Sequence, residues 1–432
     1  KLIILLTSHI SFCFGETLFL EKGKKSYQIG SYLKILIDKE KKLTIEDITS
    51  GKYDSKFKKT EKKDPSFSFL QAHFWAKVKI KNKSSFKSWI LSQNYSQQDN
   101  IILYKLVNGK WTGKLTGDSH PFGSREVESE KYSFYIEPTE TTYFIKIWGG
   151  FSKFKLRLEE EQSFHDKRTE QNYLLGLLFG VFVAMIGYNI FIFFSTRDIT
   201  YLFYVFFVVS ITFYLSNLYG FGIRFFYPEI PFLSQRGHEL LGFVFCFTIS
   251  IFWLFYLDLK SSRKNLYYVH MVFGLYGLIM AILAPNLLTF PSSFKILIIT
   301  IGITLVLVTY TTIVRFREKF RPSKFLMFAL AALIFGCFLY SGMYFGKLPE
   351  TFITKNGALI GVSLQTILLS MGLADKFNFL QEESLKKEKK LTEELSDLNN
   401  NFINKVKERT EQLSKSLNET NSLLNNMKQA VF

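Results

Sequence analysis

Residues with the potential for chemistry concentrate in the first third of this chain, and their spacing favours ligand binding over catalysis. The sequence contains no GxxxxGK[ST] phosphate-binding loop, no HExxH zinc motif and no GxSxG nucleophile elbow. His165 is followed directly by Asp166, but nothing near this pair suggests a nucleophile. We therefore predict that these residues have no enzymatic activity and bind no cofactor.

Tryptophan is the first type of candidate ligand contact. Trp75, Trp89, Trp111 and Trp148 lie in the N-terminal part of the chain, and aromatic planes suit the apolar faces of sugar rings. Tryptophan also fills the cores of β-sandwiches, and we favour that role for each of the four. Trp111 lies beside a glycine-containing turn and is the best candidate for exposure. We retain Trp111 and Trp148 as candidate ligand-binding residues.

Charged residues near a predicted turn form the second type of candidate. Asp118 and Arg125 are candidate ligand contacts at the rim of a sandwich, with the alternative that Asp118 only caps its own turn. Glu126, Glu128 and Glu130 would share one face of an extended segment, where a hard cation such as calcium binds oxygen ligands. A solvated strand face is the commoner outcome, so we predict no metal site.

The N-terminal part has a sequence period of two. Tyr143, Ile145 and Ile147 alternate with Phe144 and Lys146, and similar runs recur between turn signals from 20 to 161. Short antiparallel strands with one apolar face predict an all-β sandwich, or jelly roll, over 20–161.

The middle of the chain consists of apolar stretches long enough to cross a bilayer as helices. We predict seven spans, at about 172–194, 199–221, 238–257, 266–288, 292–314, 324–346 and 352–373. Basic residues are denser in the loops after the first, third and fifth spans, so these loops should be cytoplasmic. A signal peptide over 1–15 would place the sandwich in the periplasm. The prediction is a multi-pass protein of the bacterial inner membrane with a cytoplasmic C-terminus.

The formal net charge of +17 has a membrane explanation. In a soluble protein such an excess would suggest nucleic acid. Here much of it lies on membrane-flanking loops and on a Lys-rich N-terminal domain. We predict the lipid bilayer as a partner and no nucleic acid.

Polar residues also fall inside the predicted spans, where unpaired hydrogen-bonding groups are costly. For Asn189, Asn217, His270 and Gln365 we favour hydrogen bonds that hold the bundle together over a functional pathway. Arg197-Asp198, at the inner boundary, is predicted to form an ion pair that fixes the first helical hairpin.

Residues 376–432 are polar with a helical period. Apolar residues recur there at spacings of three and four, with a stutter-like break between Leu398 and Leu413. We predict a parallel coiled coil, and hence a homodimer, that leads to an output module missing from this sequence.

Several motifs together resemble a bacterial family, the seven-transmembrane receptors with diverse intracellular signalling modules. In the N-terminal part, the residues that resemble the family are Thr116-Gly117-Asp118, Pro121-Phe122-Gly123-Ser124-Arg125, Trp75, Trp89 and 140–144. In the membrane part, they are Tyr188-Asn189-Ile190-Phe191, Arg197-Asp198, Tyr201-Leu202-Phe203-Tyr204, Gly220, Pro228 and Ala374-Asp375-Lys376. The resemblance implies a periplasmic jelly roll related to carbohydrate-binding modules and a seven-helix domain. It also implies a cytoplasmic output such as a histidine kinase, a nucleotide cyclase or a diguanylate cyclase.

The main hypothesis is a signal-transducing receptor for a small extracytoplasmic ligand, with carbohydrate as the class that the resemblance suggests. Ligand binding would shift the bundle and change the packing of the coiled coil at its stutter. The alternative is a transporter or channel with a sandwich accessory domain, which predicts charged or broken helices at mid-span. In a third hypothesis, the seven-helix domain binds an apolar ligand and the sandwich only modulates it.

Overall fold

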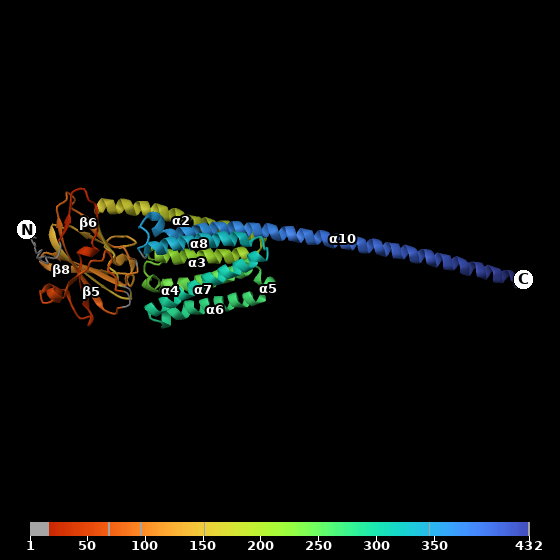
Figure 1. The fold of residues 1–432 in the computed structure, drawn as a ribbon, viewed down its shortest axis with the longest axis horizontal. Helices are drawn as coiled ribbons and strands as arrows, with labels where there is room; N and C mark the ends of the chain where they lie inside the picture. Colours follow the sequence, from red (N-terminus) through yellow and green to blue (C-terminus); the bar gives the residue numbers. More distant parts are fainter. Residues whose placement is uncertain (1–16, 68–69, 96, 151, 345, 431–432) are drawn as a thin grey trace, which may run out of the picture.

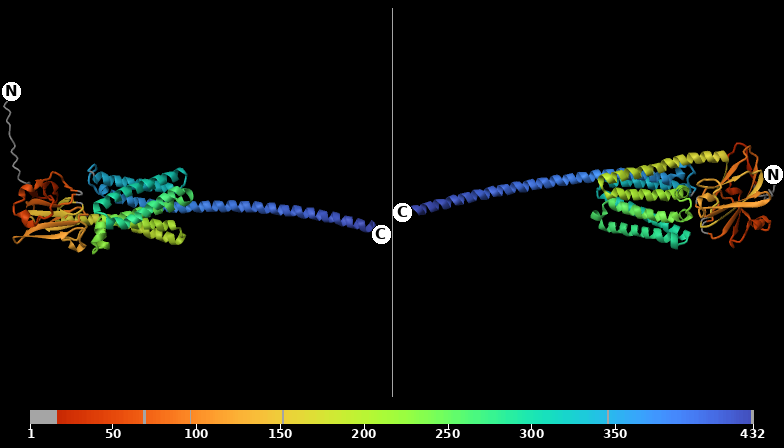
Figure 2. Two further views of the ribbon diagram at one scale, coloured as in Figure 1. Left: turned by 90° about the horizontal axis from the view of Figure 1, so that it is seen from below. Right: turned by 180° about the vertical axis from the view of Figure 1, so that it is seen from behind.

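The computed structural model describes residues 17–67, 70–95, 97–150, 152–344 and 346–430. A β-sandwich lies at one end of an elongated molecule, a helical bundle lies in the middle, and the last helix runs far beyond the bundle (Figure 1). Views from below and from behind show the same order (Figure 2). The predicted signal peptide, 1–15, lies outside the described residues.

Two sheets form the sandwich in the described part of the chain. The larger sheet has the order β4-β3-β5-β10-β7-β8, and β1 pairs in parallel with β5. The smaller sheet has the order β2-β11-β6-β9. The bounds of the larger sheet are β1 (Leu18–Leu20), β3 (Lys34–Asp38), β4 (Lys58–Lys59), β5 (His73–Asn82), β7 (Asn100–Val107), β8 (Lys110–Thr116) and β10 (Glu140–Trp148). Those of the smaller sheet are β2 (Ser26–Gln28), β6 (Trp89–Gln93), β9 (Tyr132–Ile136) and β11 (Leu156–Glu160).

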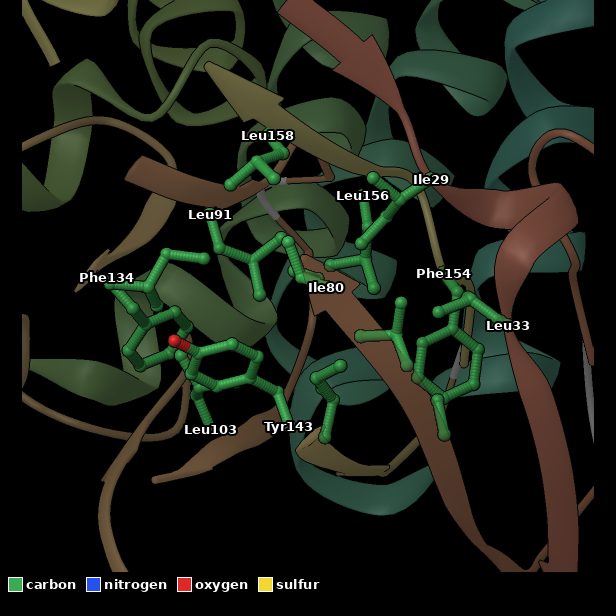
Figure 3. Packing of buried hydrophobic residues seen from close by; sticks show 14 of the residues in the cluster. Ile29, Leu33, Ile80, Leu91, Leu103, Phe134, Tyr143, Phe154, Leu156 and Leu158 are labelled. Carbon is green, nitrogen blue, oxygen red and sulfur yellow. The ribbon is translucent and has the colours of Figure 1, made fainter. Parts of the chain in front are cut away.

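The core lies between the two sheets and follows from the period of two. Alternate residues of β5 and β10 point inward, so their apolar side chains are removed from water. Figure 3 shows Ile80, Leu91, Leu103 and Phe134, which come from four different strands, in the same core. Burial of each such side chain contributes about 1.5–3 kcal/mol. The predicted sandwich is confirmed, and the jelly-roll topology stays a prediction.

The outer face of the larger sheet carries a second, smaller apolar cluster. Helix α1 (Ile45–Thr49) begins at Thr44, whose side chain forms a capping box with Asp47. Ile45 and Ile48 of this helix belong to the cluster that covers the buried Trp75. The outer face of the sheet is therefore partly closed to solvent.

Seven of the described helices are long and apolar enough to cross a membrane, which agrees with the predicted count. They are α2 (Glu161–Thr196), α3 (Ile199–Leu218), α4 (Pro231–Tyr256), α6 (Lys264–Leu287), α7 (Phe290–Arg317), α8 (Ser323–Tyr344) and α10 (Gly357–Ala430). The connections contain the π-helix η4 (Gly222–Phe226) and the short helices α5 (Leu259–Ser262) and α9 (Phe352–Lys355).

The sandwich joins the bundle without a loop, because β11 ends at Glu160 and α2 begins at Glu161. The carboxylate of Glu160 accepts hydrogen bonds from the backbone N–H groups of Gln162 and Ser163, both at 2.9 Å. A carboxylate at this position satisfies N–H groups that have no partner within the helix. The joint between strand and helix is therefore fixed by its own local chemistry.

The first helical hairpin differs from the prediction. Arg197 adopts a left-handed conformation, with φ of 59°, and ends α2, while the side chain of Asp198 accepts a hydrogen bond from the N–H of Thr200 at the start of α3. No ion pair joins Arg197 and Asp198 in the described structure. The predicted ion pair is wrong because the turn gives each residue a separate capping role.

Candidate functional site

The structure places the two candidate tryptophans at separate positions on the outer face of the larger sheet. Trp111 of β8 packs edge-on against Phe144, with ring centroids 5.1 Å apart. Trp148 ends β10, with its ring centroid 5.3 Å from that of His73. Trp148 lies four positions after Phe144 on β10, which is roughly 13 Å along a strand. The two tryptophans are half-buried and do not form one surface, and ligand binding by either stays a prediction. Trp75 and Trp89 are both fully buried, but only Trp89 lies in the core between the sheets, as the core interpretation predicted, whereas Trp75 belongs to the apolar cluster on the outer face of the larger sheet.

Asp118 and Arg125 lie inside the domain instead of at an exposed rim, with exposed fractions of 4% and 6%. The guanidinium of Arg125 lies between aromatic rings, 4.8 Å from the ring centroid of Phe122 and 4.7 Å from that of Tyr132. Burial raises the pKa of Asp118 well above its usual range; the charge of Asp99 adds to the rise, and that of Arg125 opposes it. The sequence carries no local signal for this burial, and a ligand contact by Asp118 or Arg125 stays a prediction.

The segment 116–125, which carries the TGD and PFGSR motifs, lies against the outer loops of the bundle. The N–H of Phe122 donates to the carbonyl oxygen of Pro228 at 2.9 Å. The side-chain amide of Gln235, in the first turn and a half of α4, donates to the hydroxyl of Ser119 at 2.5 Å. These contacts make the motif a junction between the sandwich and the bundle.

Glu130 is the charged centre of the same junction. Its carboxylate pairs with Arg168 of α2 at 3.1 Å and with Arg224 of η4. Burial alone would raise the pKa of Glu130, but the hydrogen bond from Arg168 and the charges of both arginines outweigh burial and lower the pKa. Gly220, with φ of 78°, lies so close that an added Cβ would be 3.1 Å from the backbone oxygen of Glu130.

The three glutamates considered for a cation do not converge. Glu126 pairs with Lys105 at 2.6 Å, Glu130 pairs with the two arginines, and Glu128 is exposed. The described residues contain no group of three His, Cys, Asp or Glu that could hold a metal ion.

A cleft of about 150 Å³ lies beside Glu130, where β11, the start of α2 and the loop before α10 meet. Its basic lining residues are Lys131, Arg157, Lys167, Arg168 and Lys355. Its acidic lining residues are Glu159 and Glu350. Burial, together with the charge of Lys355, lowers the pKa of Lys131 to about 8. No short motif marks this cleft, because its residues come from distant parts of the chain.

Polar residues inside the bundle mostly join helices to one another. Asn189 of α2 donates to Ser370 of α10 at 2.9 Å, and His270 of α6 lies 3.0 Å from the hydroxyl of Thr311 in α7. Asn217 of α3 donates to the carbonyl oxygen of Leu233 in α4 at 2.7 Å and to the hydroxyl of Tyr227 at 2.9 Å. The predicted role in holding the bundle is confirmed for these three residues. Gln365 is also buried, but its Nε2 has no hydrogen-bond partner among the described residues.

The point where α10 leaves the bundle is tied to α3 and α4. The ammonium of Lys376 donates to the hydroxyl of Thr200 at 3.1 Å and to the carbonyl oxygen of Phe255 at 2.8 Å. The hydroxyls of Tyr201 and Tyr204, both in α3, donate to carbonyl oxygens of α10 at 3.2 and 2.7 Å. Tyr201, Tyr204 and Lys376 belong to the motifs of the resemblance, but the sequence carries no signal for these contacts.

Comparison with known families finds two matches. The model of the family described as "7TM diverse intracellular signalling" matches residues 171–376. The model described as "7TMR-DISM extracellular 2" matches residues 30–158. The first match covers the helical bundle and the second covers most of the sandwich. No curated protein matches the chain.

Proposed function

The chain belongs to the seven-transmembrane receptors with diverse intracellular signalling modules, and from this premise we propose a specific route for its signal. A ligand outside the bacterial inner membrane changes how the sandwich rests on the outer loops of the bundle. The bundle then changes the packing of α10, which carries the signal to a cytoplasmic output module such as a histidine kinase or a nucleotide cyclase. Carbohydrate remains the ligand class that the resemblance suggests.

One observation carries the proposal: a continuous series of contacts leads from the sandwich to α10. The segment 116–125 and Glu130 contact the outer loops, and α2 is continuous with the sandwich strand β11. At the inner end, Tyr201 and Lys376 bind α10 to α3 and α4. A movement at the junction therefore has a direct mechanical route to α10.

The exposed apolar stripe of α10 supports the predicted parallel homodimer. Leu398 and Leu413 are 68% and 70% exposed in the single chain. Burying such a stripe against a second copy would remove it from water, and the stutter between these residues allows two packings of similar energy. The signal would favour one of the two packings.

The transporter hypothesis has less support from the buried contacts. It predicts charged residues at mid-span, whereas the ion pair of Arg236 with Glu239 lies within the first three turns of α4. The contacts that Asn189 and His270 make between helices use an uncharged amide and an imidazole, which can be neutral.

Disulfide cross-linking along α10 tests the proposal. Single cysteines would replace stripe residues from Leu395 to Leu424 in a chain whose native cysteines are changed to alanine, and the strongest cross-link reports the packing register. We expect Glu130→Gln, which disturbs the junction, to move that maximum along the stripe. Glu140→Gln removes an exposed carboxylate whose ion-pair partners, Lys79 and Lys81, belong to the sandwich, and it should leave the maximum in place. An identical pattern in all three proteins would contradict coupling between the junction and α10.

A further inference from the structure

The basic cleft beside Glu130 is formed by three parts of the molecule that the proposed signal must connect. Lys131 comes from the sandwich, directly before β9, and Arg168 comes from the start of α2. Lys355 ends α9, two residues before α10 begins. A ligand in this cleft would therefore touch the sensor domain and the approach to the output helix at the same time.

Most of the basic residues of the cleft are already paired with carboxylates. Arg157 pairs with Glu350 at 2.8 Å, and Lys167 pairs with Glu159 at 2.8 Å. Arg168 pairs with Glu130, outside the cleft. In each of these ion pairs a carboxylate neutralises one basic side chain. None of these three side chains therefore has its full charge available for a ligand.

Lys131 and Lys355 differ from the other three. Neither ammonium has an ion pair or a side-chain hydrogen bond among the described residues, although the aromatic ring of Phe164 lies 5.9 Å from the Lys131 nitrogen. Burial and the charge of Lys355 are the two largest causes that lower the pKa of Lys131. Two like charges held close together in a partly buried cleft repel each other, and a shared anion would remove that repulsion.

We propose that this cleft binds a phosphate-type oxyanion, bridged between Lys131 and Lys355. Three of the five basic lining residues are paired with carboxylates, so Lys131 and Lys355 leave an excess of two positive charges in the cleft. A phosphate group carries a charge of about −1.5 to −2 at neutral pH and has three strong acceptor oxygens, which matches two unpaired ammonium groups. The cleft of about 150 Å³ has room for such a group together with a few waters.

Glu350 is the carboxylate that such an anion would compete with. It lies in the loop before α9 and contacts Arg157 at 2.8 Å and Lys155 at 3.7 Å. Burial would raise the pKa of Glu350, but the charges of Lys155, Arg157, Lys355 and Lys131 together outweigh burial and lower the pKa, so the group is ionised. The bound anion would weaken the hold of the sandwich on this loop and create a new link through Lys355. This step rests on the proposed signalling function.

Binding of inorganic phosphate to the purified full chain in a neutral detergent tests the site. We expect saturable binding by calorimetry at pH 7, about tenfold weaker in Lys131→Gln and in Lys355→Gln, since each loses one charge-assisted contact. Lys347→Gln, on the same loop but outside the cleft, should bind as the wild type does. Glu350→Gln removes the competing carboxylate and should bind more tightly.

The phosphate could belong to a soluble compound or to a lipid headgroup, and a second arm separates these sources. The chain would be placed in nanodiscs of phosphatidylcholine with or without phosphatidylglycerol, and bound lipid would be counted by native mass spectrometry. A lipid source predicts retained phosphatidylglycerol that Lys131→Gln and Lys355→Gln lose, with weak binding of free phosphate. A soluble source predicts calorimetric binding that is the same in both lipids.

The site is disproved if neither phosphate nor phosphatidylglycerol binds, or if Lys131→Gln and Lys355→Gln bind like the wild type. The cross-linking pattern along α10 then separates this result from failure of the proposed function. Binding at the cleft with an unchanged α10 register would support the site and contradict its signalling role. A register that responds to Glu130→Gln without anion binding would leave the receptor function standing and remove the cleft from it.

Discussion

Glu130 connects the sandwich to two separate segments of the membrane part through its two carboxylate oxygens. Its own side chain is 12% exposed, so its charge and those of Arg168 and Arg224 are largely withdrawn from water. Breaking such pairs from one side leaves the remaining charges without a partner. The residue therefore matters more for the junction than an exposed ion pair would.

Glu130→Gln should lower the free energy of unfolding by about 1–3 kcal/mol, because two partly buried arginines lose their counter-charge. Thermal unfolding of the full chain in detergent measures the change. Hydrogen exchange at Phe122, whose N–H donates to Pro228, should become faster as the junction loosens. Glu140→Gln, which removes exposed pairs with Lys79 and Lys81, is the control and should change neither measurement. Equal behaviour of the two variants would contradict a structural role for Glu130.

Asp118 predicts a dependence of stability on pH with an unusual sign for a carboxyl group. Its pKa in the folded chain is raised well above the unfolded value of about 3.9. As pH rises from about 4, the unfolded state releases the proton first, so the free energy of unfolding falls until the folded pKa is passed. Asp118→Asn removes this titration and should flatten the fall, although Asp99, whose pKa is also raised, retains part of it. Unfolding followed by tryptophan fluorescence between pH 4 and 8 checks this, and an unchanged slope would contradict it.

For single residues, the sequence indicates which positions matter better than it indicates what surrounds their side chains. The TGD and PFGSR motifs identified an important segment, but not that Asp118 and Arg125 within it are buried. The pairing of Glu130 with Arg224 depends on how two domains dock, and 94 residues separate these partners. Local spacing carries no information about such a pair.

Helices α8 and α10 pack closely through glycines. A Cβ added to Gly336 would lie 2.8 Å from the Cα of Gly361 and would also clash with the carbonyl oxygen of Gly357. Small residues at this spacing let helix backbones approach within a membrane. The position of α10 in the bundle therefore depends on glycines, which have no side chain to hold the two backbones apart.

Gly336→Ala should destabilise the protein by about 1–3 kcal/mol, because the added methyl group must separate two backbones that cannot move aside locally. Gly302→Ala, in α7, is the matched control, since an added Cβ there meets no atom within 4 Å. The control should be neutral or slightly stabilising, because alanine has the higher helix propensity. Thermal unfolding in detergent compares the two, and equal stability would contradict the close-packing argument.

The elements themselves were largely predictable. The long apolar runs predicted seven helices, because a helix that crosses a bilayer needs a longer apolar run than most other structures do. The period of two identified the sandwich because one face of each sheet is buried. The burial of Trp75 beneath α1 was not predictable. Trp75 lies on the outward-facing side of its strand, where it belongs to a second apolar cluster.

On the scale of the whole molecule, α10 dominates the shape. It contains 74 residues, so it is roughly 110 Å long at 1.5 Å per residue. Most of this length lies beyond the bundle (Figure 1). Its leucine stripe has no partner within the single chain among the described residues, which makes self-association the expected way to bury it.

The double variant Leu398→Ala and Leu413→Ala should shift the full chain toward the monomer, because two large side chains of the stripe are truncated. Light scattering with size-exclusion chromatography in detergent measures the mass of the complex. Asn400→Ala lies on the opposite side of the helix and should leave the mass unchanged. If the double variant kept the mass of the wild type, the stripe would not be the dimer interface.

The direct passage from β11 into α2 gives the segment before the membrane a fixed angular relation to the sandwich. One inserted residue would turn the sandwich by about 100° around the axis of α2 and raise it by about 1.5 Å. Seven inserted residues would nearly restore the angle but raise the sandwich by about 10 Å. No small insertion restores both angle and height, so Phe122 and Glu130 could not regain their partners. The length of this segment therefore determines whether the sandwich and the bundle can form the junction.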